Sequence, residues 1–223
     1  MSRLDLRPFL AVAALALALP ATPARAADLS VGVAGGWQGG GVLRLGATAA
    51  NVWRGVPLSF ELGVGHAFID PGDPAAARRV FINENTDGTP EESGGVWDFR
   101  ADAVWKLKLW GMKDLGAVLG VRYSRYAGRF KYIGGNEDFT ISSNAWGVGL
   151  GARAAWPVGK RLAVTAALGL DWFPRQKLYG HDASYTSNNV NNGREDFTWS
   201  DADAAVNQPW LLPSLLVGMG WSL

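Results

Sequence analysis

The chain has 223 residues, with 21 Lys and Arg, 20 Asp and Glu, and no cysteine. A net charge of +1 provides no basic field for nucleic acid, so we expect no nucleic-acid partner. The lack of cysteine excludes disulfides and thiolate metal sites. We also expect no other metal site and no cofactor.

Residues 1–26 have the pattern of a cleaved secretory signal peptide. Arg3 and Arg7 precede an apolar run from Leu10 to Leu19, and Ala24-Arg25-Ala26 is a small-x-small cleavage site. The run is too short to span a bilayer as a helix, and a buried N-terminal helix is the alternative. Cleavage near Ala26 would leave one mature domain, residues 27–223, with a net charge of about −1.

Eight segments of this domain alternate with the two-residue period of a β-strand. In the clearest one, residues 97–109, an apolar face that includes Trp97, Phe99 and Trp105 opposes a face with Asp98 and Arg100. The other seven segments are residues 29–33, 43–49, 58–64, 115–123, 146–156, 162–172 and 215–223. After residue 26 no stretch of about twenty apolar residues occurs, so a membrane protein of this kind would cross the bilayer as a closed barrel.

The connections between these segments alternate in length. Residues 51–56, 110–113 and 157–160 form short turns, whereas the loops at 70–95, 127–144 and 174–208 are longer, and only 35–40 among that second set is short. In an up-and-down barrel alternate connections lie at opposite ends, and in outer-membrane barrels the short turns are periplasmic. We therefore expect both ends of the domain in the periplasm and three sizeable loops outside the cell.

The tryptophans lie near the predicted strand ends. Five fall toward the long-loop end, namely Trp37, Trp97, Trp146, Trp172 and Trp210, and four toward the short-turn end, namely Trp53, Trp110, Trp156 and Trp221. An indole ring is favoured in the headgroup zone, where its N–H stays hydrated, so we expect two aromatic girdles. These three patterns together predict an all-β fold, an eight-stranded antiparallel up-and-down transmembrane β-barrel.

The face opposite the apolar one is sparse, with glycine, alanine and isolated charges. An eight-stranded barrel has an interior only just wide enough for side chains, so this face fits a crowded lumen. We expect a lumen charge network of Arg44, Glu61, Arg100, Asp102, Lys106, Arg122, Arg153 and Asp171. Its excess of basic residues leaves a small anion-leaning pore as an alternative, and a secreted soluble barrel is a further one.

A lipid A-modifying barrel enzyme is the third alternative, and it has little support in the sequence. His66 and His181 are the two histidines, and neither has the His-x-Ser arrangement of outer-membrane lipid A deacylases, although Ser184 follows His181 closely. Asn83-x-Asn85-x-Asp87-Gly88 resembles half of a calcium loop, but Gly94 stands where the required Glu would be. We expect a protein that is not an enzyme, with no catalytic, cofactor or metal residues.

Two features are expected within the long loops. Asp73 and Pro74 have the order of an N-cap and a first helical residue, which predicts a short helix through the alanines that follow. The last long loop, residues 174–208, which is rich in asparagine from Asn188 to Asn192, is predicted to be mobile.

The end of the chain, Gly218-x-x-Trp221-x-Leu223, resembles the C-terminal assembly signal of outer-membrane barrels, with Leu where Phe or Trp is usual. With the export signal and eight strands, the chain resembles the small barrel family of the OmpA transmembrane domain, OmpX and the opacity proteins. The resemblance implies a monomer inserted by the barrel assembly machinery among outer-membrane lipid and lipopolysaccharide. It also implies a structural or surface-interaction role through the loops, with an unknown extracellular partner. Because the sequence stops at the eighth strand, we expect no peptidoglycan-binding domain after it.

Overall fold

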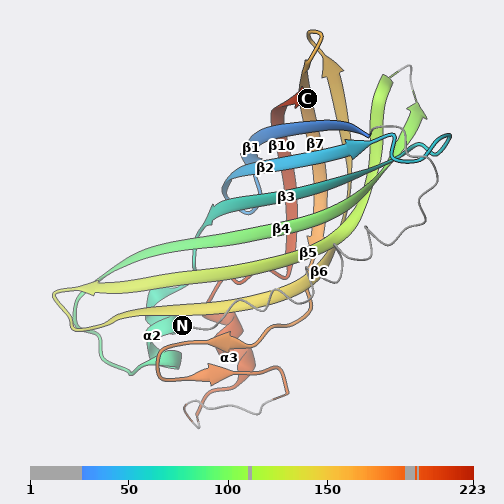
Figure 1. The fold of residues 1–223 in the computed structure, drawn as a ribbon. Coiled ribbons are helices and arrows are strands. Elements are labelled where there is room, and N and C mark those ends of the chain that lie inside the picture. The colour runs from blue at the N-terminus through green and yellow to red at the C-terminus, as the bar shows by residue number, and fades with distance from the viewer. Residues whose placement is uncertain (1–26, 110–111, 189–193, 195) are drawn as a thin grey trace.

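The computed structural model describes residues 27–109, 112–188, 194 and 196–223, which form a closed barrel with a folded cap at one end (Figure 1). The barrel strands are β1 (Asp28–Trp37), β2 (Gly41–Ala50), β3 (Leu58–Ile69), β4 (Thr89–Leu109), β5 (Met112–Ile133), β6 (Asp138–Pro157), β7 (Leu162–Trp172) and β10 (Leu211–Ser222). Every neighbouring pair is antiparallel, and the β1–β10 and β5–β6 pairings complete the cylinder. The predicted eight-stranded antiparallel barrel is confirmed.

The two ends of the barrel differ. Short turns at 51–57 and 158–161 lie at one end, where the amide of Leu223 also donates to the carbonyl of Leu29 at 3.0 Å. The other end carries α2 (Pro74–Phe81), the β8 (Leu178–Tyr179) and β9 (Ser184–Tyr185) hairpin, and α3 (Trp199–Ala204), which we call the cap (Figure 1). Within the described residues, neither helix is long and apolar enough to cross a membrane.

The outer face of the barrel is apolar. Ten aliphatic side chains on it are more than half exposed, namely Leu29, Leu43, Leu45, Leu62, Leu119, Val148, Leu150, Leu168, Leu215 and Val217. They occupy the parity that the sequence assigned to lipid. A continuous exposed apolar surface of this kind is unfavourable in water and is typical of a lipid-facing band.

The alternation of apolar and polar residues continues past this band, but the apolar residues now face inward and the polar residues face outward. On β5 the outward residues change from Leu119 and Val121 to Arg125 and Arg129, while the inward residues change from Arg122 to Phe130. The inversion falls near Tyr123, where β4, β5 and β6 continue beyond the ends of the other strands (Figure 1). Toward the short turns the outward residues are suited to lipid. Toward the cap the outward residues are suited to water, and the inward residues pack against the cap.

This inversion corrects the predicted loops. Residues 127–144 are not a loop but the end of β5, a tight turn at 134–137 and the start of β6. The loop at 70–95 gives its last residues to β4, and 174–208 contains β8, β9 and α3. The predicted loops were too long because a strand with its apolar face inward does not continue the outward apolar pattern.

Two further expectations about the loops have different outcomes. Asp73 caps α2, accepting hydrogen bonds from the amides of Ala75 at 2.8 Å and Ala76 at 3.1 Å, which confirms the predicted helix start. The mobile-loop prediction is wrong for the ordered part of the last loop, where Leu178 and Tyr185 are fully buried. Residues 189–193, like the predicted signal peptide at 1–26 and Trp110, lie outside the described residues.

Candidate functional site

A tier of ion-paired side chains crosses the lumen just inside the cap. It contains Arg44 from β2, Asp98, Arg100 and Asp102 from β4, Arg122 from β5 and Asp171 from β7, all at most 8% exposed. Three arginines face three aspartates, so the tier is neutral. We call this set the lumen tier.

Asp171 links two of the arginines of the lumen tier. Its Oδ2 accepts from Arg100 Nη2 at 2.9 Å, and its Oδ1 accepts from Arg122 Nε at 2.7 Å. Arg122 Nη1 also donates to Asp102 Oδ1 at 2.6 Å. Charge-assisted bonds of this length offset much of the cost of burying each charge.

Asp98 extends the tier to the wall on which β2 lies. Its Oδ2 accepts from Arg100 Nε at 3.1 Å and lies 3.4 Å from Arg44 Nη2. Arg44 also donates to Gln38 Oε1 at 2.7 Å, and Gln38 Nε2 donates to Asp171 at 3.4 Å. The side chains therefore form one connected barrier across the lumen.

A second level lies nearer the short-turn end. Arg153 of β6 pairs with Glu61 of β3, and their side chains are 28% and 23% exposed. A small cavity of about 120 Å³ borders this pair and extends past Thr48 and Thr165. The lumen is thus hollow toward the short turns and filled at the lumen tier.

Glycines on the inner face make room for the tier. A Cβ added at Gly149 would collide with Asp171 Oδ1 and the Arg122 guanidinium, and one at Gly120 would collide with Asp102 Oδ1. The sparse inward parity of the sequence therefore reflects the space that buried arginine side chains occupy.

The structure brings together seven of the eight predicted lumen residues, in the tier and in the Arg153–Glu61 pair. Lys106 lies half-buried on the same face of β4. The predicted network lacked Asp98 and Gln38, although Asp98 lies on the strand face that was assigned to the lumen. Asp98 shares the parity of Arg100 and Asp102, which was the available signal, and including it reduces the basic excess on which an anion-leaning pore was predicted.

The cap is anchored by Arg78 of α2, a side chain that is only 1% exposed. Its Nη2 lies 2.6 Å from Glu137 Oε2 in the β5–β6 turn, and its Nη1 donates to the carbonyl of Asp87 at 2.8 Å. The guanidinium carbon also lies 4.2 Å from the centroid of the Tyr132 ring. One arginine thereby joins α2 to the turn between β5 and β6, a role that its place in the predicted 70–95 loop did not indicate.

Three tyrosines fix the cap from other sides. Tyr126 donates to the carbonyl of Pro71 at 2.7 Å, Tyr132 to that of Pro74 at 2.6 Å, and Tyr185 to that of Val80 at 2.8 Å. Burial raises the pKa of the Tyr126 phenol, so this hydroxyl remains a donor at physiological pH.

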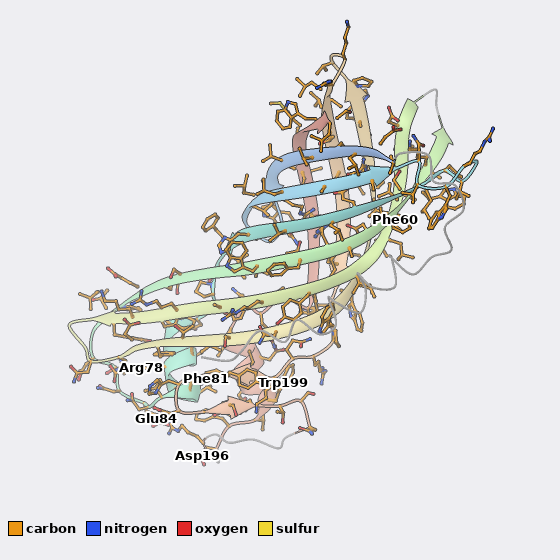
Figure 2. The ribbon with its side chains drawn as sticks, in the orientation of Figure 1. Phe60, Arg78, Phe81, Glu84, Asp196 and Trp199 are labelled. Carbon is orange, nitrogen blue, oxygen red and sulfur yellow. The ribbon has the colours of Figure 1, made fainter. Side chains whose placement is uncertain are left out.

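Apolar packing completes the cap. Ala77, Val80 and Phe81 of α2 are buried against Phe130 of β5, and the same core includes Phe139, Ile141, Leu178, Tyr185, Trp199 and Ala202. Figure 2 shows Arg78, Phe81 and Trp199 grouped at the cap end, whereas Phe60 lies toward the opposite end of the barrel. The end that the sequence assigned to loops is therefore a packed unit.

Replacing Arg78 by alanine is expected to loosen the cap without unfolding the barrel, because Glu137 and Tyr132 lose their shared partner. Amide hydrogen exchange in α2 should rise by at least about tenfold, as expected for local opening, while exchange in β1 stays unchanged. Arg78 and Asn83 hold the pKa of Glu137 below its usual value. The Arg78–Glu137 pair therefore stabilises the cap at any pH above the ordinary pKa of a glutamate. This stabilisation is lost as the pH falls through the lowered pKa of Glu137.

Arg79→Ala is the matched control, since Arg79 is exposed on the same helix. Equal acceleration of exchange in both variants would show that Arg78 does not anchor the cap.

The histidines do not form a catalytic site with Ser184. The His66 ring faces outward between Phe68 and Trp97, at centroid distances of 4.7 Å and 4.8 Å, and His181 Nδ1 lies 2.5 Å from Asp182 in an exposed turn. Among the described residues, no three His, Cys, Asp or Glu side chains come together as a metal site.

The calcium-like segment is made of successive Asx turns. The amide of Asn85 donates to Asn83 Oδ1 at 3.0 Å, and that of Asp87 donates to Asn85 Oδ1 at 3.1 Å. The side-chain oxygens thus satisfy local amides, as expected of such turns.

No protein-family model and no curated protein matches this sequence. Among solved structures, a major outer membrane protein from Thermus thermophilus matches with a TM-score of 0.73 and 25% identity, covering 89% of this chain and 100% of that one. This chain is a small outer-membrane β-barrel. CarO of Acinetobacter baumannii matches with a TM-score of 0.45, 14% identity and coverage of 88% and 98%. Neisserial surface protein A matches with a TM-score of 0.41, 13% identity and coverage of 88% and 96%.

In an outer-membrane barrel, the predicted girdles would lie at the two lipid headgroup layers. Seven of their tryptophans are at least 38% exposed, namely Trp37, Trp97, Trp146, Trp172, Trp210, Trp156 and Trp221. Trp53 is half-buried, with its ring edge-on to Phe60 at 5.4 Å. Trp105 is a further exposed indole on β4 that the sequence analysis did not assign to a girdle.

Proposed function

We propose that this outer-membrane barrel is a non-enzymatic protein with a structural or surface-interaction role, performed by its capped end. The observation that carries the proposal is the lumen tier beneath the folded cap. A filled lumen leaves little room for solute passage, and a packed cap presents a defined surface to the outside. An enzyme of the bilayer would need a base beside a nucleophile, and the partners of His66 and His181 do not provide one.

The cap lies outside the cell in this proposal, and both ends of the domain lie in the periplasm. The short turns and the terminal Gly218, Trp221 and Leu223 support this orientation by their resemblance to barrels inserted by the barrel assembly machinery. Lipopolysaccharide and outer-membrane lipid would surround the apolar band of a monomer. The export signal at 1–26 would direct the chain to the envelope.

Cysteine labelling tests the location and orientation, because the native chain has no cysteine. Glu84→Cys lies in the cap, where the native side chain is 69% exposed, and Val158→Cys lies in a short turn at a position 60% exposed. A membrane-impermeant maleimide should label Glu84→Cys on intact cells and Val158→Cys only after the outer membrane is permeabilised. The reverse pattern would contradict the orientation, and recovery in the soluble periplasmic fraction would contradict the membrane location.

Conductance tests the filled lumen. The refolded barrel in planar lipid bilayers is expected to give no stable conductance steps, since the lumen tier has no residue more than 8% exposed. Reproducible single-channel steps from the heat-modifiable, folded protein would favour the pore alternative over this proposal.

A further inference from the structure

A cleft separates the rim of the barrel from the cap beside β7 and β10. Its walls come from the end of β7, the segment that follows it, α3 and the segment before β10, and its volume is about 410 Å³. It lies at the level of the outer girdle, because Trp172 and Trp210 line it. We call it the rim cleft.

Three indoles give the rim cleft aromatic walls. Trp172 and Trp210 are 49% and 64% exposed, and the third, Trp199 of α3, is buried. Trp199 Nε1 donates to the carbonyl of Gln176 at 2.7 Å, so its ring orientation is fixed by the cleft backbone. A ring held in this way provides flat apolar surface with little entropy left to lose on binding.

Polar groups occur among these rings. The Arg175 guanidinium lies 5.3 Å from the Trp199 ring centroid and its side chain is exposed, and Asp203 is half-buried. Gln208 is 9% exposed, and its Nε2 donates to Asp203 Oδ1 at 2.5 Å. Its Oε1 has no partner within the described residues. A buried acceptor without a partner is unfavourable, so the site is suited to a ligand that supplies a donor.

We propose that the rim cleft binds a sugar residue of a cell-surface glycan. A pyranose ring has an apolar C–H face that packs on an indole, and a rim of hydroxyls that both donate and accept hydrogen bonds. One hydroxyl would donate to Gln208 Oε1 and another to Asp203, while Arg175 would donate to a hydroxyl oxygen. The proposal rests on the proposed function in one respect, which is that the cap faces outward.

Other ligand classes fit the rim cleft less well. A phosphate group would meet the Asp203 carboxylate, and an alkyl chain would leave Gln208 Oε1 unpaired. The sugar could belong to the lipopolysaccharide that surrounds the barrel or to a glycan that reaches it from outside. Both present the same chemistry to the cleft.

The test is a calorimetric titration of the full refolded protein in detergent, with barrel closure verified by heat modifiability. The probes are the core oligosaccharide released from lipopolysaccharide, maltohexaose and chitohexaose. Saturable binding of at least one probe is expected, and Trp210→Ala and Gln208→Leu should weaken it by about tenfold or more. Gln208→Leu also removes the hydrogen bond from Gln208 Nε2 to Asp203, so its melting temperature is measured alongside its binding. Trp210 is 64% exposed, so Trp210→Ala should leave the melting temperature unchanged, which separates binding from stability.

Trp97→Ala is the matched control. Trp97 is 49% exposed in the same girdle, but it lies on β4, away from the cleft, so binding should be unchanged. Binding of the core oligosaccharide alone would assign the site to lipopolysaccharide, and binding of a neutral oligosaccharide would assign it to an outside glycan.

Three results would overturn the proposal: no saturable binding of any probe, equal loss in Trp97→Ala, or displacement of the probe by inorganic phosphate. This titration does not depend on orientation in the cell. A failure here with surface labelling of Glu84→Cys would therefore remove the glycan site and leave the proposed function intact.

Discussion

Replacing Asp171 by alanine is expected to destabilise the barrel by about 3–5 kcal/mol, because it leaves buried arginines without their shared acceptor. Asp171 receives Arg100 and Arg122 at 2.9 Å and 2.7 Å, and all three side chains are at most 7% exposed. The remaining carboxylates, Asp98 and Asp102, each already pair with one of these arginines. The measurement is the free energy of unfolding from urea titration of the refolded protein.

Asp138→Ala is the matched control for this loss. Asp138 also accepts two hydrogen bonds from one arginine, Arg129, at 2.9 Å and 2.5 Å, but the side chains are 44% and 57% exposed. Water replaces the lost partner there, so the expected cost is small beside that of Asp171→Ala. Similar costs for the two variants would mean that the lumen tier is hydrated and does not seal the barrel.

The barrel itself could be predicted from sequence because lipid imposes a simple rule on each strand. Leu119 and Val121 point outward and Arg122 points inward, and the same alternation recurs in all eight strands. The charged lumen followed from the same parity, since a charge on the outer face of a membrane strand is costly. Which arginine meets which aspartate depended on the register of strands far apart in the chain, and period alone carries no such information.

The cap could not be predicted in the same way. Phe130 and Ile141 face inward there because they pack against α2 and β8–β9. The same strands therefore have lipid outside at one end and the apolar cap inside at the other, and the apolar residues change face between the two. Arg78 falls within the predicted 70–95 loop, although it is buried between Glu137 and Tyr132. Burial of this kind depends on tertiary contacts between loops, which have no repeating signal. The sequence feature that could have indicated the cap is a switch of the apolar residues from one face of a long strand to the other.

The central claim is that the apolar outer face lies in lipid and that β4–β6 rise out of it into water. Its most direct test is one substitution made on each side of that boundary. Ala103 of β4 faces outward, between Phe60 and Leu119 of the neighbouring strands. Ala127 of β5 also faces outward, but on the cap side of the girdle, beside Gly95 and Ser142.

The free energy of unfolding in lipid vesicles is the deciding measurement. Ala103→Arg should lower it by about 2–4 kcal/mol, because a guanidinium is placed in the bilayer. Ala127→Arg should change it by about 0–1 kcal/mol, because the new charge is solvated and only adds weak repulsion from Arg125 and Arg129. A negligible cost at Ala103, or equal costs at both positions, would contradict the assignment of the outer face to lipid.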